Sequence, residues 1–184
     1  LDDNGQTEWH TDAQVDEAGN SKVNGKKVLA RRVEKMSKSK YNGVDPEEII
    51  ARYGVDSARL FVLCASPPEN DLVWKDEGVE GVHRFLTRVW NMVEKRQEDL
   101  QKAESYSGDG SDLEGPTKEL RKLTHQTIQK VTDDVDGRFH FNTAIARCME
   151  LMNAISKFKA KDSLSHSVHK DAVSALVNMM SPFA

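Results

Sequence analysis

Apolar residues recur every three or four positions through most of the second half of the chain, and this is the spacing of one face of an α-helix. Four long amphipathic helices are predicted: one from about Asp76, one after a linker at 104–116, one capped by Asn142 and one near Lys170–Met180. The first stripe consists of Val79, Val82, Phe85, Leu86, Val89, Trp90 and Val93. Such helices with short links bury their apolar faces most economically as an antiparallel bundle, so the sequence predicts a mainly α fold.

Two shorter helices are predicted before this bundle. Asp45 is placed to cap the first, with Pro46 at its first position and Glu48 able to close a capping box. Gly54 is predicted to end it. Asp56 is then placed to cap a second helix, which the following Ser-Pro-Pro sequence ends.

The first 33 residues have no helical period and contain three turn signals of the Asn-Gly or Gly-Asn type. We interpret them as a small antiparallel β element, part of an insertion, with a surface loop as the alternative. The predicted domains are therefore a β insertion at 1–33, a loop with two short helices at 34–75, and the bundle at 76–184.

Composition places the chain among ordinary soluble proteins, with 184 residues, 30% charged residues and a net charge of -4. No apolar run is long enough for a membrane span, and no secretory leader is visible. Cys64 and Cys148 lie in helical apolar patterns, which predicts reduced core residues and a cytoplasmic protein. The ends at Leu1 and Ala184 are interpreted as cuts in a longer protein.

The charge is distributed unevenly. Residues 1–20 contain six acids and no Lys or Arg, whereas residues 21–40 contain eight bases and one acid. Lys35, Lys38 and Lys40 lie directly before the first helix start. A local positive field in an acidic chain favours a small, well-placed anion over broad coating of nucleic acid, although a solvated basic loop is the simpler alternative.

The chemistry available to this loop is that of compact positive charges on flexible stems. Ammonium groups that reach a triphosphate can offset the charge that builds on a leaving pyrophosphate, and contacts that tighten only in the transition state lower the barrier. Ser37 and Ser39 can donate hydrogen bonds without adding bulk, and Gly43 allows the backbone to move as a closing loop requires.

The letters of the loop are more specific than its charge. Residues 35–39 read KMSKS, which resembles the signature of class I aminoacyl-tRNA synthetases, and the segments at 40–46 and 53–60 look like those that follow it there. Downstream, ASPPENDLVW at 65–74, with the GVEG and RFLTRVW sequences after it, is similar to bacterial leucyl-tRNA synthetases. The resemblance covers about residues 34–184, including KVTDD and FNTAIA in the bundle. One departure is a tyrosine at position 41, where many relatives have Asn.

The resemblance implies a two-step reaction in which leucine and Mg-ATP give leucyl-adenylate, and the leucyl group then passes to tRNA(Leu). It implies that Lys35 and Lys38 are the catalytic residues that steady the ATP phosphates, while Met36, Ser37 and Ser39 complete the ATP-binding loop. It also implies that the bundle is an anticodon-binding-type domain, that no metal is bound within this chain itself, and that the enzyme acts as a monomer.

The same resemblance leaves part of the active site unaccounted for. No His-Ile-Gly-His-like segment occurs in the chain, so we expect the fragment to be inactive alone. Two alternatives stay open: an isoleucyl-, valyl- or methionyl-tRNA synthetase fragment, and a non-catalytic tRNA-binding helical module that keeps the loop as a relic.

Arg84 and Arg88 lie one turn apart on the first predicted bundle helix and are candidates for tRNA phosphate contacts. The alternative is a solvated helix face with Trp90 in the core. Asp133, Asp134 and neighbouring acids have the wrong spacing for a calcium loop, and no histidine pair has convincing metal-ligand spacing.

Overall fold

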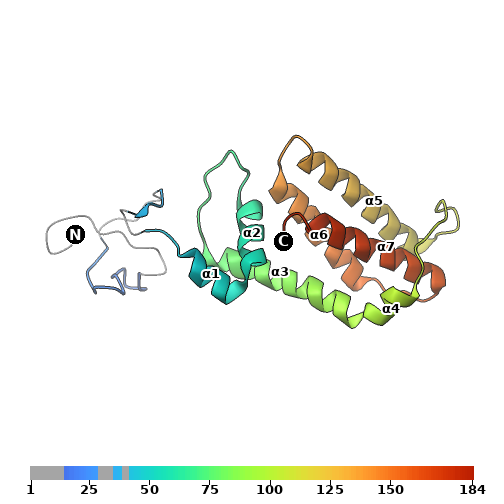
Figure 1. The fold of residues 1–184 in the computed structure, drawn as a ribbon, viewed down its shortest axis with the longest axis horizontal. Coiled ribbons are helices and arrows are strands. Elements are labelled where there is room, and N and C mark those ends of the chain that lie inside the picture. Colours follow the sequence, from blue (N-terminus) through green and yellow to red (C-terminus); the bar gives the residue numbers. More distant parts are fainter. Residues whose placement is uncertain (1–14, 29–34, 39–41) are drawn as a thin grey trace. The chain divides into compact units, whose positions relative to one another are not determined.

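The computed structural model describes residues 15–28, 35–38 and 42–184, and this part of the chain is mainly helical (Figure 1). It divides into two compact units, Leu1–Glu48 and Ile49–Ala184. The helices are α1 (Pro46–Tyr53), α2 (Val55–Ala65), α3 (Asp76–Lys95), α4 (Gln97–Lys102), α5 (Gly115–Val135), α6 (Phe141–Lys157) and α7 (Ser163–Met180). No helix in the described ranges combines the length and the apolar character needed to cross a membrane.

The predicted β element is not confirmed. Residues 1–14 and 29–33 of it lie outside the described residues, and the described part between them holds two isolated bridges, Val15 to Ser21 and Asn20 to Lys27. The segment folds as a tight turn in which the Asp16 carboxylate accepts the backbone N–H of Asn20 at 2.7 Å. That bond lowers the pKa of Asp16 below its usual value.

The junction between α1 and α2 follows the predicted capping signals only in part. The Asp45 carboxylate accepts the backbone N–H of Glu47 at 2.9 Å, so the predicted cap of α1 is confirmed. The predicted cap of α2 by Asp56 is wrong, because α2 already begins at Val55. Gly54 stands between the two helices with a φ of 84°, a conformation in which glycine avoids the strain of a side chain.

Four long helices, α3, α5, α6 and α7, alternate in direction, as the short links predicted, and α5, α6 and α7 pack against one another (Figure 1). α2 packs against both α3 and α6. The largest fully buried side chains are Leu60, Leu113, Ile145, Leu151, Ile155, Leu176, Val79, Val168 and Cys148. Each large aliphatic side chain removed from water stabilises the fold by about 1.5–3 kcal/mol, so this shared core holds the bundle together.

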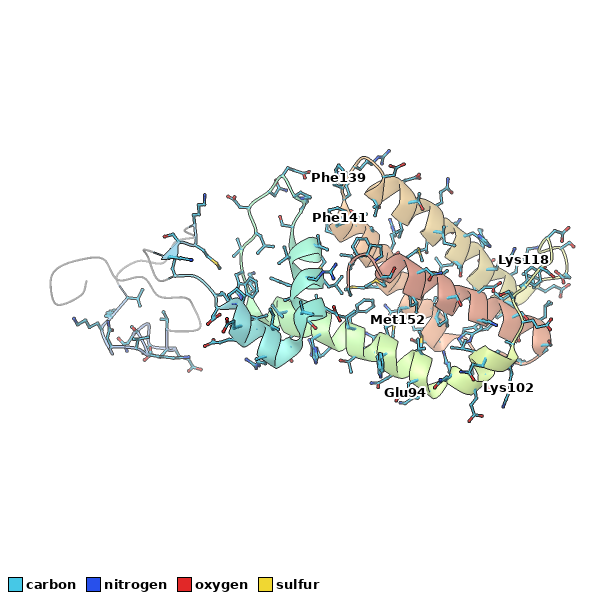
Figure 2. All side chains as sticks on the ribbon, in the orientation of Figure 1. Glu94, Lys102, Lys118, Phe139, Phe141 and Met152 are labelled. Atoms are coloured by element: carbon cyan, nitrogen blue, oxygen red, sulfur yellow. The ribbon has the colours of Figure 1, made fainter. Side chains whose placement is uncertain are left out.

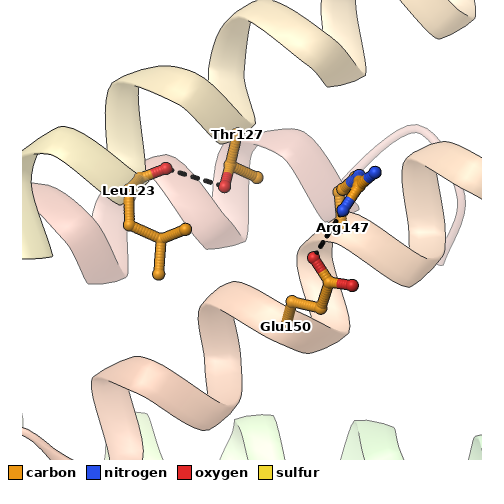
Figure 3. Close-up of polar contacts among 4 residues, drawn as sticks. All are labelled: Leu123, Thr127, Arg147 and Glu150. Atoms are coloured by element: carbon orange, nitrogen blue, oxygen red, sulfur yellow. Dashed lines mark hydrogen bonds and ion pairs between the residues drawn. The ribbon is translucent and has the colours of Figure 1, made fainter.

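Buried hydroxyl groups on α5 find partners in their own helix. The Thr127 hydroxyl on α5 donates to the carbonyl of Leu123 at 2.8 Å. At the surface of α6, by contrast, Arg147 forms an ion pair with Glu150 at 2.8 Å, and both side chains reach solvent (Figure 3). No buried side-chain nitrogen or oxygen in the described part of the chain is left without a hydrogen-bond partner. The bundle interior therefore carries little penalty from unpaired polar groups.

The apolar stripe predicted on α3 is wider than the face that the helix buries. Val79, Val82, Phe85 and Met92 are buried, whereas Trp90 is 72% exposed. The alternative that placed Trp90 in the core is therefore wrong. At 3.6 residues per turn, Trp90 lies about 140° around the helix from Phe85 and points away from the line that packs against the bundle.

The start of α7 also differs from the prediction. The helix begins at Ser163 rather than near Lys170, because the Asp162 carboxylate accepts the N–H of Ser165 at 2.7 Å while the Ser165 hydroxyl accepts the N–H of Asp162 at 3.0 Å. This is a capping box closed by serine instead of glutamate. Asn142, predicted as a cap, lies inside α6.

The segment predicted as a linker is folded against α7. Lys170 donates to the carbonyl of Ala103 at 2.6 Å, and the Asp171 carboxylate accepts the backbone N–H of Tyr106 at 3.1 Å. Leu113 is only 1% exposed. The serines and glycines of the predicted linker therefore form an ordered connection. α5 begins inside that predicted linker, at Gly115.

The two cysteines are free thiols with different environments. Cys148 is fully buried, as predicted for a core residue, and burial raises the pKa of its thiol to about 11. Cys64 is only half-buried, and burial raises the pKa of its thiol as well. Neither thiol is shifted toward the reactive thiolate form.

Candidate functional site

The segment from residue 35 to residue 45, named here the lysine loop, is described at 35–38 and 42–45. Lys35 and Lys38 are exposed, Met36 is 43% exposed and Ser37 is half-buried. Ser39, predicted to bind ATP, lies outside the described residues. The two described ammonium groups are thus open to solvent, where an anion can approach them.

Asn42 connects the two described sides of the lysine loop. Its side-chain oxygen accepts the backbone N–H of Ser37 at 2.9 Å, and its amide nitrogen donates to the carbonyl of Lys35 at 3.4 Å. The loop backbone is therefore closed on itself by one side chain. The sequence predicts no role for Asn42, because its partners lie five and seven residues away and leave no local pattern.

The two arginine candidates on α3 have different partners. Arg84 lies 4.0 Å from Glu80, one turn before it, and its side chain is 70% exposed. Arg88 donates to the side-chain oxygen of Asn153 at 2.7 Å and reaches the sulfur of Met152, which α6 places toward α3 (Figure 2). Arg88 therefore ties α3 to α6, and a phosphate contact by Arg88 would have to compete with that bond.

Metal ligands are not gathered in the described part of the chain: it holds no group of three His, Cys, Asp or Glu side chains placed to bind an ion. Among the cationic side chains that the chain can offer to an anion are Lys35 and Lys38 of the lysine loop, which are three positions apart in the sequence.

Comparison with known proteins places this geometry in a family. Residues 24–75 match the family model for class I tRNA synthetases of the isoleucine, leucine, methionine and valine type, and residues 117–184 match the model for the anticodon-binding domain of tRNA ligases. The leucine–tRNA ligase of Desulfatibacillum aliphaticivorans is 52% identical over 162 residues, covering 86% of this chain. The chain belongs to the class I tRNA synthetases.

Further relatives of this synthetase chain are also leucine–tRNA ligases. The one from Acinetobacter baumannii (strain AYE) is 44% identical over 192 residues and covers 99% of this chain. Because the two relatives match over 18% and 22% of their own lengths, the chain spans about a fifth of the curated relatives it matches. It corresponds to part of a leucine–tRNA ligase.

A solved structure agrees with this assignment. The fold of this synthetase chain is similar to that of the agnB2 LeuRS of Agrobacterium radiobacter K84, solved in a ternary complex with tRNA and LeuAMS. The TM-score is 0.72 at 30% identity, over 82% of this chain and 19% of that one. The helical part of the fold is therefore shared with a synthetase whose complex includes tRNA.

Proposed function

We propose that this chain is the part of a leucine–tRNA ligase that supplies a phosphate-stabilising loop and a tRNA-supporting helical domain. The complete enzyme would activate leucine with ATP to leucyl-adenylate and transfer the leucyl group to tRNA(Leu). The observation that carries the proposal is the KMSKS sequence at residues 35–39, inside a segment that matches class I synthetases of the I, L, M and V type.

In this proposal Lys35 and Lys38 act on the first step. Their exposed ammonium groups meet the triphosphate of ATP, whose Mg²⁺ enters as part of the substrate. When the bond to the departing pyrophosphate breaks, negative charge builds on the phosphate oxygens, and two nearby cations stabilise it. Met36, Ser37 and Ser39 set the shape of the loop, and Asn42 keeps its ends together.

The domain assignment is part of the same proposal: a small insertion at 1–33, the lysine loop and its short helices at 34–75, and an anticodon-binding-type bundle at 76–184. The match of 117–184 to an anticodon-binding model supports a bundle that holds tRNA(Leu). Arg84, on the exposed side of α3, is the better placed of the two arginine candidates for a phosphate contact. We propose that the complete enzyme is a cytoplasmic monomer.

The test uses ATP–pyrophosphate exchange by a full-length ligase that carries this segment. Lys38→Ala is expected to slow leucine-dependent exchange by about 10²–10³-fold, as the loss of one preorganised stabiliser does elsewhere. Unchanged kinetics would remove the lysine loop from the mechanism. The 184-residue chain by itself is expected to show no exchange, and measurable activity would contradict its role as a part only.

The same assay separates the alternative amino acids. Exchange with leucine, isoleucine, valine and methionine should favour leucine, as the leucine–tRNA ligase relatives indicate. Absence of exchange with all four, together with binding of tRNA, would support the non-catalytic tRNA-binding module instead.

A further inference from the structure

Met36 is the most exposed of the six methionines, all of which lie in the described part of the chain. It is 43% exposed, whereas the other five are buried or half-buried. Those five are on α3, α6 and α7: Met92, Met149, Met152, Met179 and Met180. A dissolved oxidant reacts with a thioether only where it can reach the sulfur, so Met36 is the methionine of this chain most open to oxidation.

The backbone on both sides of Met36 is held by one side chain. Asn42 donates to the carbonyl of Lys35 at 3.4 Å and accepts the N–H of Ser37 at 2.9 Å. Met36 therefore lies between two anchored peptide groups while its side chain stays open to solvent. Lys35 directly precedes it and Lys38 follows two positions later, so a chemical change at Met36 takes place between the two lysines proposed to act on ATP.

The proposed task of the lysine loop also requires this exposure. A loop that binds ATP has to be reached by the nucleotide from water, so the complete enzyme must leave a path to it that admits a much smaller molecule such as hydrogen peroxide. Bound ATP would close that path, because the lysines proposed to hold its phosphates stand on both sides of Met36. The sulfur is therefore open in the free enzyme and shielded in the ATP complex.

The reaction of this side chain with a peroxide is a two-electron oxygen transfer. A lone pair of the Met36 sulfur attacks one oxygen of hydrogen peroxide, a sulfur–oxygen bond forms and the oxygen–oxygen bond breaks. The departing hydroxide takes the proton of the transferred oxygen and leaves as water. The sulfur is oxidised to a sulfoxide, the peroxide is reduced to water, and reductases can reverse the change in the protein.

The sulfoxide differs from the thioether in the property that matters beside lysines. A thioether sulfur is a weak acceptor, whereas the sulfoxide oxygen is polar and accepts hydrogen bonds. The flexible side chains of methionine and lysine allow this oxygen to meet the ammonium group of Lys35 or Lys38. An ammonium group that donates to the sulfoxide has less to offer to the phosphates of ATP.

We propose that Met36 is a reversible modification site: its oxidation to the sulfoxide by a peroxide slows adenylate formation, because the new oxygen competes with ATP for the ammonium groups of the lysine loop. The proposal rests on the function proposed for Lys38, and the experiment below separates the two.

The first measurement follows leucine-dependent ATP–pyrophosphate exchange by a full-length ligase after treatment with hydrogen peroxide and removal of the peroxide by catalase. Exchange should slow about tenfold, which is less than the 10²–10³-fold expected when a whole ammonium group is lost. Peptide mass spectrometry should find one added oxygen on Met36 in step with the loss. MgATP present during the treatment should prevent both changes. Methionine sulfoxide reductases with dithiothreitol should restore the rate, and dithiothreitol alone should not.

The second measurement compares two variants, each by its rate after peroxide divided by its own rate before. Met36→Leu keeps the volume and the apolar character of the side chain but has no sulfur to oxidise, and it should retain more than about half of its rate. Met92→Leu, at a buried methionine of α3, is the matched control and should lose as large a fraction as the unsubstituted enzyme.

Three results would overturn the proposal even where Lys38→Ala is slow: an equal fractional loss in Met36→Leu, a loss that the reductases do not reverse, or oxidation of Met36 without a change in rate. If Met36→Leu has too little exchange to measure, the unsubstituted enzyme decides, since its rate must fall and recover together with the sulfoxide at Met36. Unchanged exchange by Lys38→Ala would instead overturn the function proposed for the loop, and the role of Met36 with it.

Discussion

The lysine loop and the helical bundle are stabilised by opposite means. In the loop, Lys35 and Lys38 are exposed and the described backbone is closed by two hydrogen bonds from one side chain, that of Asn42. In the bundle, α5, α6 and α7 share a core of fully buried aliphatic side chains such as Leu151 and Leu176. The loop residues proposed to act on ATP therefore contribute little to the folding free energy, whereas the buried side chains of the bundle contribute most of it.

This contrast makes stability and activity separable. Substitutions of exposed loop residues should change rates and leave unfolding nearly unaffected, since surface changes usually stay within about 0.5 kcal/mol. Substitutions in the bundle core should lower the free energy of unfolding and leave the rate of leucine activation by the folded enzyme nearly unchanged. Three further predictions test the contrast, in order of decreasing expected effect.

The largest effect is expected in the core. Leu151→Ala should lower the free energy of unfolding by about 2–5 kcal/mol, because it removes buried methylene groups and leaves a cavity in a side-chain cluster with no solvent exposure. Met36→Ala, at a loop residue that is 43% exposed, should change it by less than about 0.5 kcal/mol. Urea unfolding followed by far-UV circular dichroism measures both, and similar losses for the two variants would break the contrast.

The next prediction concerns the pH dependence of stability, which we attribute to His169 in the bundle. Burial, together with the positive charge of Arg96, whose guanidinium lies 3.0 Å from Nε2 of His169, lowers the pKa of His169 to about 4. Nearby His166 also lowers this pKa, and Asp99 raises it. Between pH 4 and about 6.5 the unfolded chain binds more protons at this position than the folded chain, so stability is complete above pH 6.5 and is lost as the pH falls toward 4.

The loss from His169 should reach on the order of 2 kcal/mol. His169→Gln, which keeps an acceptor for Arg96 but does not titrate, should show a flatter dependence of the urea midpoint on pH across this window. Equal slopes for the two proteins would mean that folding does not lower the pKa of His169.

The smallest effect is expected at the link that closes the lysine loop. Asn42→Ala removes both hydrogen bonds to the loop backbone, each of which contributes about 1 kcal/mol, so leucine-dependent exchange by the full-length enzyme should slow about 3- to 10-fold. Asn42→Asp keeps the acceptor for the N–H of Ser37, so its exchange rate should lie between those of Asn42→Ala and the unsubstituted enzyme. The melting temperature should stay constant, and a drop as large as that of Leu151→Ala would place Asn42 among the residues that hold the fold.

Local signals in the sequence predicted the start of α1, because its capping partner is close in sequence. Asp45 caps α1 through a neighbour two residues away. The start of α7 was missed because Ser163–His169 is polar and the serine at Ser165 closes the capping box in place of an acidic residue. The exposure of Trp90 was missed because periodicity identifies an apolar stripe but does not show which of its residues are buried.

In the candidate site, too, features read from adjacent residues were predicted and features that depend on distant partners were not. The KMSKS letters at 35–39 identified the lysine loop, since a specific sequence needs no knowledge of the fold. The role of Asn42 could not be predicted, because its partners lie five and seven positions away along the chain. Arg88 was named as a candidate for tRNA phosphate contacts, and only the packing of α3 on α6 shows that Asn153 is its partner.

The ordered connection between α4 and α5 has a mechanical consequence. Lys170 and Asp171 lie about two turns into α7 and hydrogen-bond the backbone at Ala103 and Tyr106. Leu113 is buried just before α5 starts. A connection pinned at both ends cannot serve as a slack tether. We expect a displacement of α7 to move the first turn of α5 with it, because the connection between α4 and α5 is attached to α7.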